Sequence, residues 1–118
     1  YINAGHSQPL YYSAAKKKCE YWDAGGIVIG MLPDIELTEH KHKMEINDIL
    51  ILYTDGVTEA VDTNGEQFGE ERFAKLIEDN AHLSAKELRK LIVNEVLKFT
   101  GDNEQFDDIT LLIIKKKE

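Results

Sequence analysis

The sequence predicts an α+β fold. Two observations carry this prediction: short apolar segments rich in β-branched and aromatic residues, typical of strands, and two later segments whose apolar residues recur at helical spacing. The chain has 118 residues, of which 42% are hydrophobic and 31% charged, as is ordinary for a soluble globular protein with one core. No repeat, low-complexity tract or linker divides it. We therefore expect one domain or part of one.

The first predicted elements are short strands. Residues 9–13 and 19–22 flank a polar Ala-Ala-Lys-Lys-Lys segment and are predicted to pair as a hairpin. Residues 36–44 are mostly polar and alternate imperfectly, which predicts a half-exposed strand near a sheet edge. Residues 49–53 are continuously apolar, which predicts a strand covered on both faces at the centre of the protein.

Two helices and a last strand are predicted next. Residues 70–79 place three apolar residues on one stripe: Phe73, Leu76 and Ile77. Residues 84–87 form a capping box that opens a second helix, and Gly101 ends that helix. Its inward residues are expected to be Leu88, Leu91, Ile92, Val96 and Phe99. Residues 108–115 are apolar and β-branched, which predicts the last strand.

Charge and cysteine content limit the partners and the compartment. The net charge of −8 argues against nucleic acid or an anionic membrane as the main partner, because an acidic surface repels polyanions. The single cysteine excludes an internal disulfide and favours a cytoplasmic protein. No apolar run is long enough to cross a membrane. The chain begins without methionine, inside an apparent strand, so we expect it to be a fragment of a longer protein.

Acidic residues lie at the ends of two predicted strands. Asp55 follows the 49–53 strand, and Asp107 and Asp108 precede the last one. If these strands are antiparallel neighbours, the acids meet at one sheet edge. There the carboxylates repel one another and lose hydration, which is costly unless a cation or hydrogen-bond donors compensate. A metal ion is the simplest compensation. Oxygen ligands favour Mg²⁺ or Mn²⁺ over zinc, and Gly56 would let the backbone turn tightly beneath the ion and offer its carbonyl. An Asp-Gly pair after a strand also commonly forms a plain hairpin turn, so both interpretations stay open here.

Five segments occur in the order and approximate spacing of one protein family. They are NAGHSQPL at 3–10, GGIVIGMLPD at 25–34, DILILYTDGVTEA at 48–60, GEQFGEERF at 65–73 and DDITLLII at 107–114. The sequence resembles the C-terminal half of a PPM-type protein phosphatase of the SpoIIE/RsbU group. This resemblance implies that residues 1–118 are the C-terminal portion of one phosphatase domain whose N-terminal part is absent. It also implies a fold that is part of an αββα sandwich of mostly antiparallel sheets.

The resemblance implies roles for residues of the TDG and DDIT motifs. Asp55 and Asp107 match catalytic ligands of a two-metal centre that holds Mg²⁺ or Mn²⁺, and Gly56 matches the glycine beside the first of them. Asp108 stands where related phosphatases often carry Asn, so it is expected beside the ligands rather than on the metal, as is Thr54.

Four further residues match the family less directly. Glu59 falls four residues after Asp55, where some PPM phosphatases carry an acid that touches an additional metal; an exposed loop glutamate is the open alternative. Asn3, Gly5 and His6 of the NAGH motif resemble a structural strand-turn element rather than a set of ligands.

The implied activity is hydrolysis of phosphoserine or phosphothreonine on a regulatory protein, by a water that two metal ions activate. The implied substrate is a STAS-type anti-sigma-factor antagonist in a bacterial partner-switching pathway, and an upstream sensor or regulatory domain is expected in the full-length chain. The family's bridging aspartate lies upstream of this sequence, so the fragment alone is predicted to be nearly inactive and to self-associate through strands that lost their cover. The alternative is a non-catalytic, phosphatase-like binding or regulatory module; the presence of Asp55 and Asp107 favours the enzyme.

Overall fold

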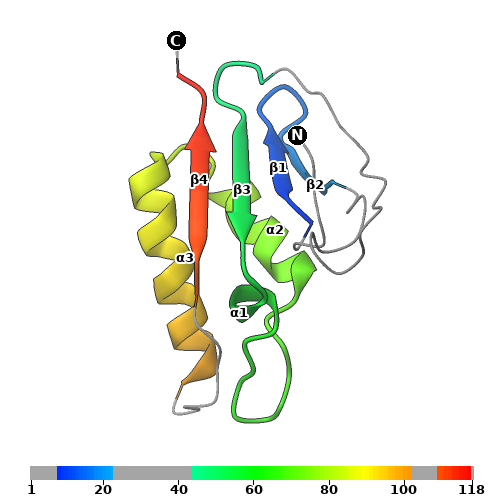
Figure 1. The fold of residues 1–118 in the computed structure, drawn as a ribbon, viewed down its shortest axis with the longest axis vertical. Coiled ribbons are helices and arrows are strands. Elements are labelled where there is room, and N and C mark those ends of the chain that lie inside the picture. The colour runs from blue at the N-terminus through cyan, green and yellow to red at the C-terminus, as the bar shows by residue number, and fades with distance from the viewer. Residues whose placement is uncertain (1–7, 23–43, 102–108, 118) are drawn as a thin grey trace, which may run out of the picture.

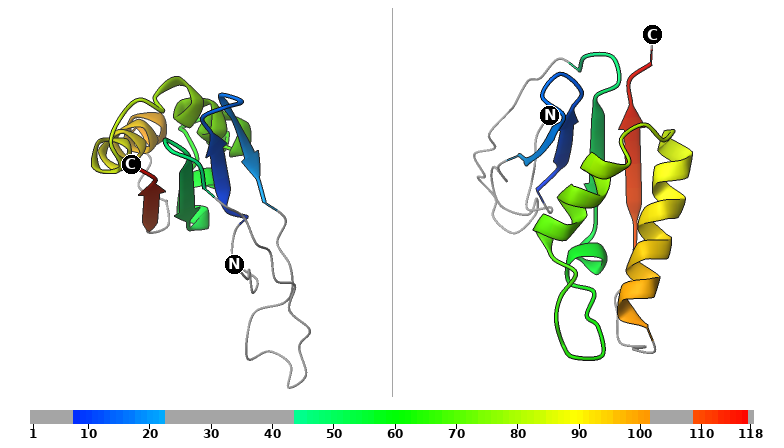
Figure 2. Two further views of the ribbon diagram at one scale, coloured as in Figure 1. Left: turned by 90° about the horizontal axis from the view of Figure 1, so that it is seen from above. Right: turned by 180° about the vertical axis from the view of Figure 1, so that it is seen from behind.

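A computed structural model of the chain describes residues 8–22, 44–101 and 109–117. The elements in chain order are β1 (Leu10–Ser13), β2 (Lys18–Tyr21), β3 (Ile49–Tyr53), α1 (Asp55–Thr58), α2 (Glu70–Asp79), α3 (Ala85–Thr100) and β4 (Leu111–Lys115). The four strands form one antiparallel sheet in the order β2-β1-β3-β4. Helices α2 and α3 cover one face of this sheet (Figures 1 and 2). The predicted α+β fold with an antiparallel sheet is confirmed; the strand predicted over 36–44 falls almost wholly outside the described residues.

The predicted N-terminal hairpin is confirmed and is held beside β3 by a buried carboxylate. Asp48, which is 3% exposed, lies one residue before β3. Its carboxylate accepts hydrogen bonds from the Tyr11 hydroxyl, from the backbone N–H of Ala14 at 2.8 Å and from the backbone N–H of Glu45 at 3.1 Å. Burial, and then the bond to Asp48, raise the pKa of Tyr11, so its hydroxyl stays a donor. These bonds offset the cost of burying the charge.

Strand β3 lies in the interior of the sheet, between β1 and β4, as predicted. Its side chains alternate: Ile49, Ile51 and Tyr53 are buried, whereas Leu50 and Leu52 are half-buried. The expectation that both faces of β3 are covered is therefore wrong for the chain as described. Successive side chains of a strand point to opposite faces, and α2 and α3 cover only one of them.

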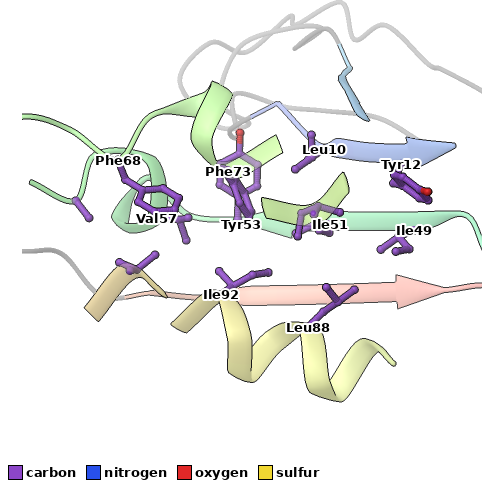
Figure 3. Packing of buried hydrophobic residues seen from close by; sticks show 13 residues of the cluster. Leu10, Tyr12, Ile49, Ile51, Tyr53, Val57, Phe68, Phe73, Leu88 and Ile92 are labelled. Carbon is purple, nitrogen blue, oxygen red and sulfur yellow. The ribbon is translucent and has the colours of Figure 1, made fainter. Parts of the chain in front are cut away.

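The core fills the space between the sheet and the helices (Figure 3). From α2 it receives Phe73 and Ile77, and from α3 it receives Leu88, Ile92, Val96 and Thr100. Leu76 and Phe99 are partly buried and pack against this cluster. The ring of Phe73 meets that of Tyr53 edge to face, with centroids 5.0 Å apart. The helical stripes predicted from sequence thus face the core, except that Leu91 is half-buried and does not belong to this cluster. Burial of this apolar surface is the main source of stability.

The predicted capping box at the start of α3 is confirmed. The Ser84 hydroxyl accepts from the backbone N–H of Glu87 at 3.1 Å, and the Glu87 carboxylate accepts from the backbone N–H of Ser84 at 3.3 Å. These hydrogen bonds to Ser84 lower the pKa of Glu87. At the other end, Gly101 adopts φ 58°, in the left-handed region that favours glycine at a helix terminus.

Replacing Ser84 by Ala is expected to lower the free energy of unfolding by about 1 kcal/mol, because the first turn of α3 loses the acceptor for one of its free N–H groups. Urea denaturation of the protein measures this change. Ser84→Asp, which restores an acceptor at the same position, is expected to recover most of the loss. Equal stability of the Ala variant and the unchanged protein would contradict the capping role.

Candidate metal centre

Asp55 lies where β3 ends and α1 begins. Tyr53 is the last residue of β3, Thr54 is the N-cap of α1, and Asp55 is the first residue of that helix, with its side chain exposed. The chain does not form a hairpin turn here, so that alternative for the Asp-Gly pair is wrong. Gly56 is buried inside α1, and the first bond of this helical turn runs from the Val57 N–H to the Thr54 carbonyl at 3.1 Å.

The start of β4 lies beside the end of β3. The two strands are antiparallel neighbours, and their register pairs Tyr53 with Leu111. One step further, the Thr54 N–H donates to the Thr110 carbonyl at 3.1 Å, and the Thr110 N–H donates to the Thr54 hydroxyl at 3.1 Å. The arrangement of strands that a shared acidic site requires is therefore present.

Two aromatic side chains pack around Tyr53, the last residue of β3. Tyr53 packs edge to face against Phe73 and against Tyr21, whose ring centroid is 6.4 Å away. The Tyr21 hydroxyl donates to the Glu70 carbonyl at 2.6 Å. Burial, followed by the negative charges of Glu70 and Asp55, raises the pKa of Tyr53, so the residue is neutral near neutral pH. Burial also raises the pKa of Tyr21, so neither tyrosine competes with Asp55 as an anionic ligand.

The remaining predicted site residues fall into two groups. Glu59 is exposed and is the C-cap of α1; its backbone N–H donates to the Asp55 carbonyl at 2.8 Å. The others lie outside the described residues: Asp107, Asp108, Asn3, Gly5 and His6. Within residues 8–22, 44–101 and 109–117, no group of three His, Cys, Asp or Glu side chains could hold a metal ion. Asp55 fits a hard divalent ion by the chemistry of its oxygens, but needs further ligands to hold one.

Sequence analysis did not single out Thr110 or the tyrosine pair. Thr110 is the last residue of the DDIT motif, and this position was the only feature of the sequence that could have drawn attention to it. Tyr53 was predicted only as the last residue of the apolar 49–53 strand.

Within residues 8–22, 44–101 and 109–117, no helix is both long and apolar enough to cross a membrane.

The antiparallel sheet with helices α2 and α3 on one face matches the α+β fold of solved PP2C phosphatase domains. The SiaA-PP2C domain of Pseudomonas aeruginosa superposes with a TM-score of 0.78 at 23% identity, over 97% of this chain and 44% of that one. The RsbU and RsbW domains of Rv1364c from Mycobacterium tuberculosis give a TM-score of 0.76 at 26% identity, over 99% of this chain and 32% of that one. The predicted fold class agrees with both.

Sequence comparison identifies the family. The model of the family described as Stage II sporulation protein E (SpoIIE) matches residues 1–117, so the chain belongs to the SpoIIE family. Phosphoserine phosphatase RsbU of Bacillus subtilis (strain 168) is 35% identical over 118 residues, which cover 99% of this chain and 34% of that protein. The chain thus spans about a third of the length of this relative. The resemblance inferred from the five motifs is confirmed.

Proposed function

We propose that residues 1–118 form the C-terminal part of a metal-dependent protein serine/threonine phosphatase domain, in which Asp55 and Asp107 are ligands of a two-metal centre. The observation that carries the proposal is the tie between Thr54 and Thr110 at the joined ends of β3 and β4. Asp55 follows Thr54 directly, and Asp107 precedes Thr110 by three residues. Chain length alone limits the separation of the Asp107 and Thr110 Cα atoms to about 11 Å.

The chemistry of the donors supports Mg²⁺ or Mn²⁺ in this site. Asp55 and Asp107 offer carboxylate oxygens, and hard divalent ions prefer oxygen ligands. Gly56 and Glu59 are assigned minor roles, through a backbone carbonyl and an outer acid; Asp108 and Thr54 are assigned supporting positions beside the ligands. Bound ions would lower the pKa of a water and stabilise charge on the phosphoryl oxygens. The task of the protein residues is to hold the acids at a fixed separation, because phosphoryl transfer depends mainly on positioning and electrostatics.

The proposed substrate is a phosphoserine or phosphothreonine of a STAS-type regulatory protein, and the proposed context is a longer chain with an upstream sensor or regulatory domain. Two findings support this reading: membership of the SpoIIE family and 35% identity to a phosphoserine phosphatase. The cytoplasmic location and the roles of Asn3, Gly5 and His6 stay predictions from the sequence.

Hydrolysis of a phosphoserine peptide tests the proposal. The complete protein is expected to release phosphate with Mn²⁺ and to stop when a chelator removes the metal, whereas residues 1–118 alone are expected to be nearly inactive. Absence of metal-dependent hydrolysis by the complete protein would favour the binding-module alternative. Robust turnover by the 118-residue chain would show that the predicted inactivity of the fragment is wrong.

The isolated 118-residue chain is expected to self-associate through the sheet face opposite the helices. On that face Leu112 is 54% exposed and Ile114 is 43% exposed, and their cross-strand partners are Leu52 and Leu50. Together these four side chains form an apolar surface on neighbouring strands. Light scattering is expected to give a mass well above the 13.5 kDa of one chain.

Charged substitutions identify the face that is responsible. The double variant Leu112→Lys and Ile114→Lys is expected to be monomeric, because lysines on this face oppose its burial. Leu97→Lys, at a similarly exposed leucine of α3 (45% exposed), is expected to leave the association unchanged. A monodisperse monomer of the unchanged chain would contradict the prediction.

A further inference from the structure

Strand β4 leaves one edge of the sheet open. It stands last in the sheet order, so its strand neighbour among the described residues is β3 alone. The Thr110 carbonyl points toward β3, where it accepts from Thr54. Because backbone groups alternate in direction along a strand, the N–H and carbonyl groups of Leu111, Ile113 and Lys115 point away from β3. An edge of this kind can pair with a further strand.

A groove of about 410 Å³ lies between β4 and the first half of α3. On the strand side it is lined by residues 111–113. Helix α3 runs alongside the outer side of β4 (Figures 1 and 2). The Lys115 ammonium joins the two walls, because it donates at 2.8 Å to the carbonyls of Ala81 and Leu83, just before α3 begins. The groove therefore has a fixed frame.

Three cationic side chains line the helix side of the groove: Lys86, Arg89 and Lys90. Their spacing of three and four residues makes them neighbours on the helix surface. All three are exposed, and within the described part of the chain none of them forms a salt bridge. No described acidic residue lines the groove, and the carboxylate of Glu87 accepts from the Ser84 N–H. The groove is thus a positive site on a chain of net charge −8.

We propose that this groove binds an extended acidic segment of a partner protein, which pairs with β4 as a fifth strand of the sheet. Successive side chains of such a strand point to opposite faces. On the face that the helices cover they meet the three cations, and on the other face they continue the apolar surface of Leu112 and Ile114. The expected segment therefore alternates acidic and apolar residues. This inference does not depend on the proposed metal centre.

The cations also favour this occupant over a second copy of the chain. Two copies that paired through their β4 edges would place like charges of their α3 helices side by side, and like charges beside an edge oppose its pairing. An acidic segment neutralises the same charges. Exposed charges are largely screened beyond about 8 Å at physiological ionic strength. The nearby cations therefore act on a bound segment more strongly than the negative charges elsewhere on the chain do.

Fluorescence anisotropy of a labelled short peptide that alternates Glu and Val, titrated with the complete protein, tests the inference. The peptide is expected to bind, and more weakly as salt is added. The double variant Lys86→Glu and Arg89→Glu is expected to bind it about tenfold or more weakly, and to bind a peptide that alternates Lys and Val instead. The matched control, Lys16→Glu with Lys75→Glu, makes the same change of net charge at exposed residues outside the groove and is expected to bind as the unchanged protein does.

Backbone N-methylation distinguishes strand pairing from a contact between charges alone. Only every second N–H of an added strand faces β4. Of two peptides, one N-methylated at every Glu and the other at every Val, one is therefore expected to lose binding and the other to keep it. Equal binding of both, or equal weakening in the two double variants, would overturn the inference. So would a complete protein that does not bind the Glu-Val peptide, whether a second copy or another segment of the same chain covers the edge.

Discussion

Replacing Asp55 by Asn is expected to lower the kcat/KM of the complete protein for a phosphoserine peptide by about a hundredfold or more. Asn has nearly the shape of Asp but lacks the negative charge that a hard divalent ion selects. Loss of one preorganised electrostatic contact in an active site typically costs a factor of this size or more. Because the Asp55 side chain is exposed, the substitution leaves the core packing intact. Steady-state kinetics at saturating Mn²⁺, with the melting temperature as a check on folding, measures the effect.

Asp79→Asn is the matched control for this prediction. Asp79 is also exposed, but it is the last residue of α2, at the opposite end of that helix from Glu70. Its replacement is expected to leave kcat/KM unchanged, and removal of an acid from a helix C-terminus does not destabilise the helix. An Asp55→Asn protein that hydrolyses the peptide as fast as the Asp79→Asn protein would remove Asp55 from the reaction.

Replacing Phe73 by Ala is expected to lower the free energy of unfolding by about 3–5 kcal/mol. Phe73 is fully buried between α2 and β3, and its ring packs against Tyr53 (Figure 3). The truncation removes buried apolar surface and leaves a cavity that the neighbouring aromatic ring only partly fills. Because Tyr53 directly precedes Thr54, the cavity also loosens the support of the candidate metal centre. Urea denaturation of the complete protein measures the loss.

Leu97→Ala provides the comparison for Phe73→Ala. Leu97 lies on α3 and is 45% exposed, so its truncation creates no buried cavity. The free energy of unfolding is therefore expected to change by less than about 0.5 kcal/mol. If both variants unfold at the same urea concentration, Phe73 does not contribute to the core as described.

The helices were predictable because their signals are local. The helix predicted over 70–79 has the same bounds as α2. The capping box at Ser84 and the terminal Gly101 mark the two ends of α3. Each of these features depends on residues within one or two turns of one another, so no knowledge of the tertiary structure is needed. The hairpin of β1 and β2 was predictable for the same reason.

Features that depend on distant pairs were not predictable. Asp48 joins Tyr11 across 37 residues, and Thr54 joins Thr110 across 56. A single sequence shows the residue types but not which of them meet. The last strand, predicted from residue 108, begins at Leu111, because at Thr54 the partner chain turns into α1 and the regular ladder stops. Burial of β3 on one face likewise depends on the layer packed against it rather than on its own composition.

For the candidate site, the sequence analysis stated only a condition, that the strand before Asp55 and the last strand be antiparallel neighbours, and the pairing of β3 with β4 meets it. The roles of Asp55 and Asp107 came from the resemblance to a family and stay proposals. The helical conformation after Thr54 was not predicted, since an Asp-Gly pair is compatible with several turn types.

Anomalous diffraction from crystals of the complete protein with Mn²⁺ tests the central claim most directly. The account predicts an ion whose coordination sphere, at about 2–2.5 Å, includes a carboxylate oxygen of Asp55 and one of Asp107. An ion bound elsewhere, or two carboxylates that face different cavities, would contradict it.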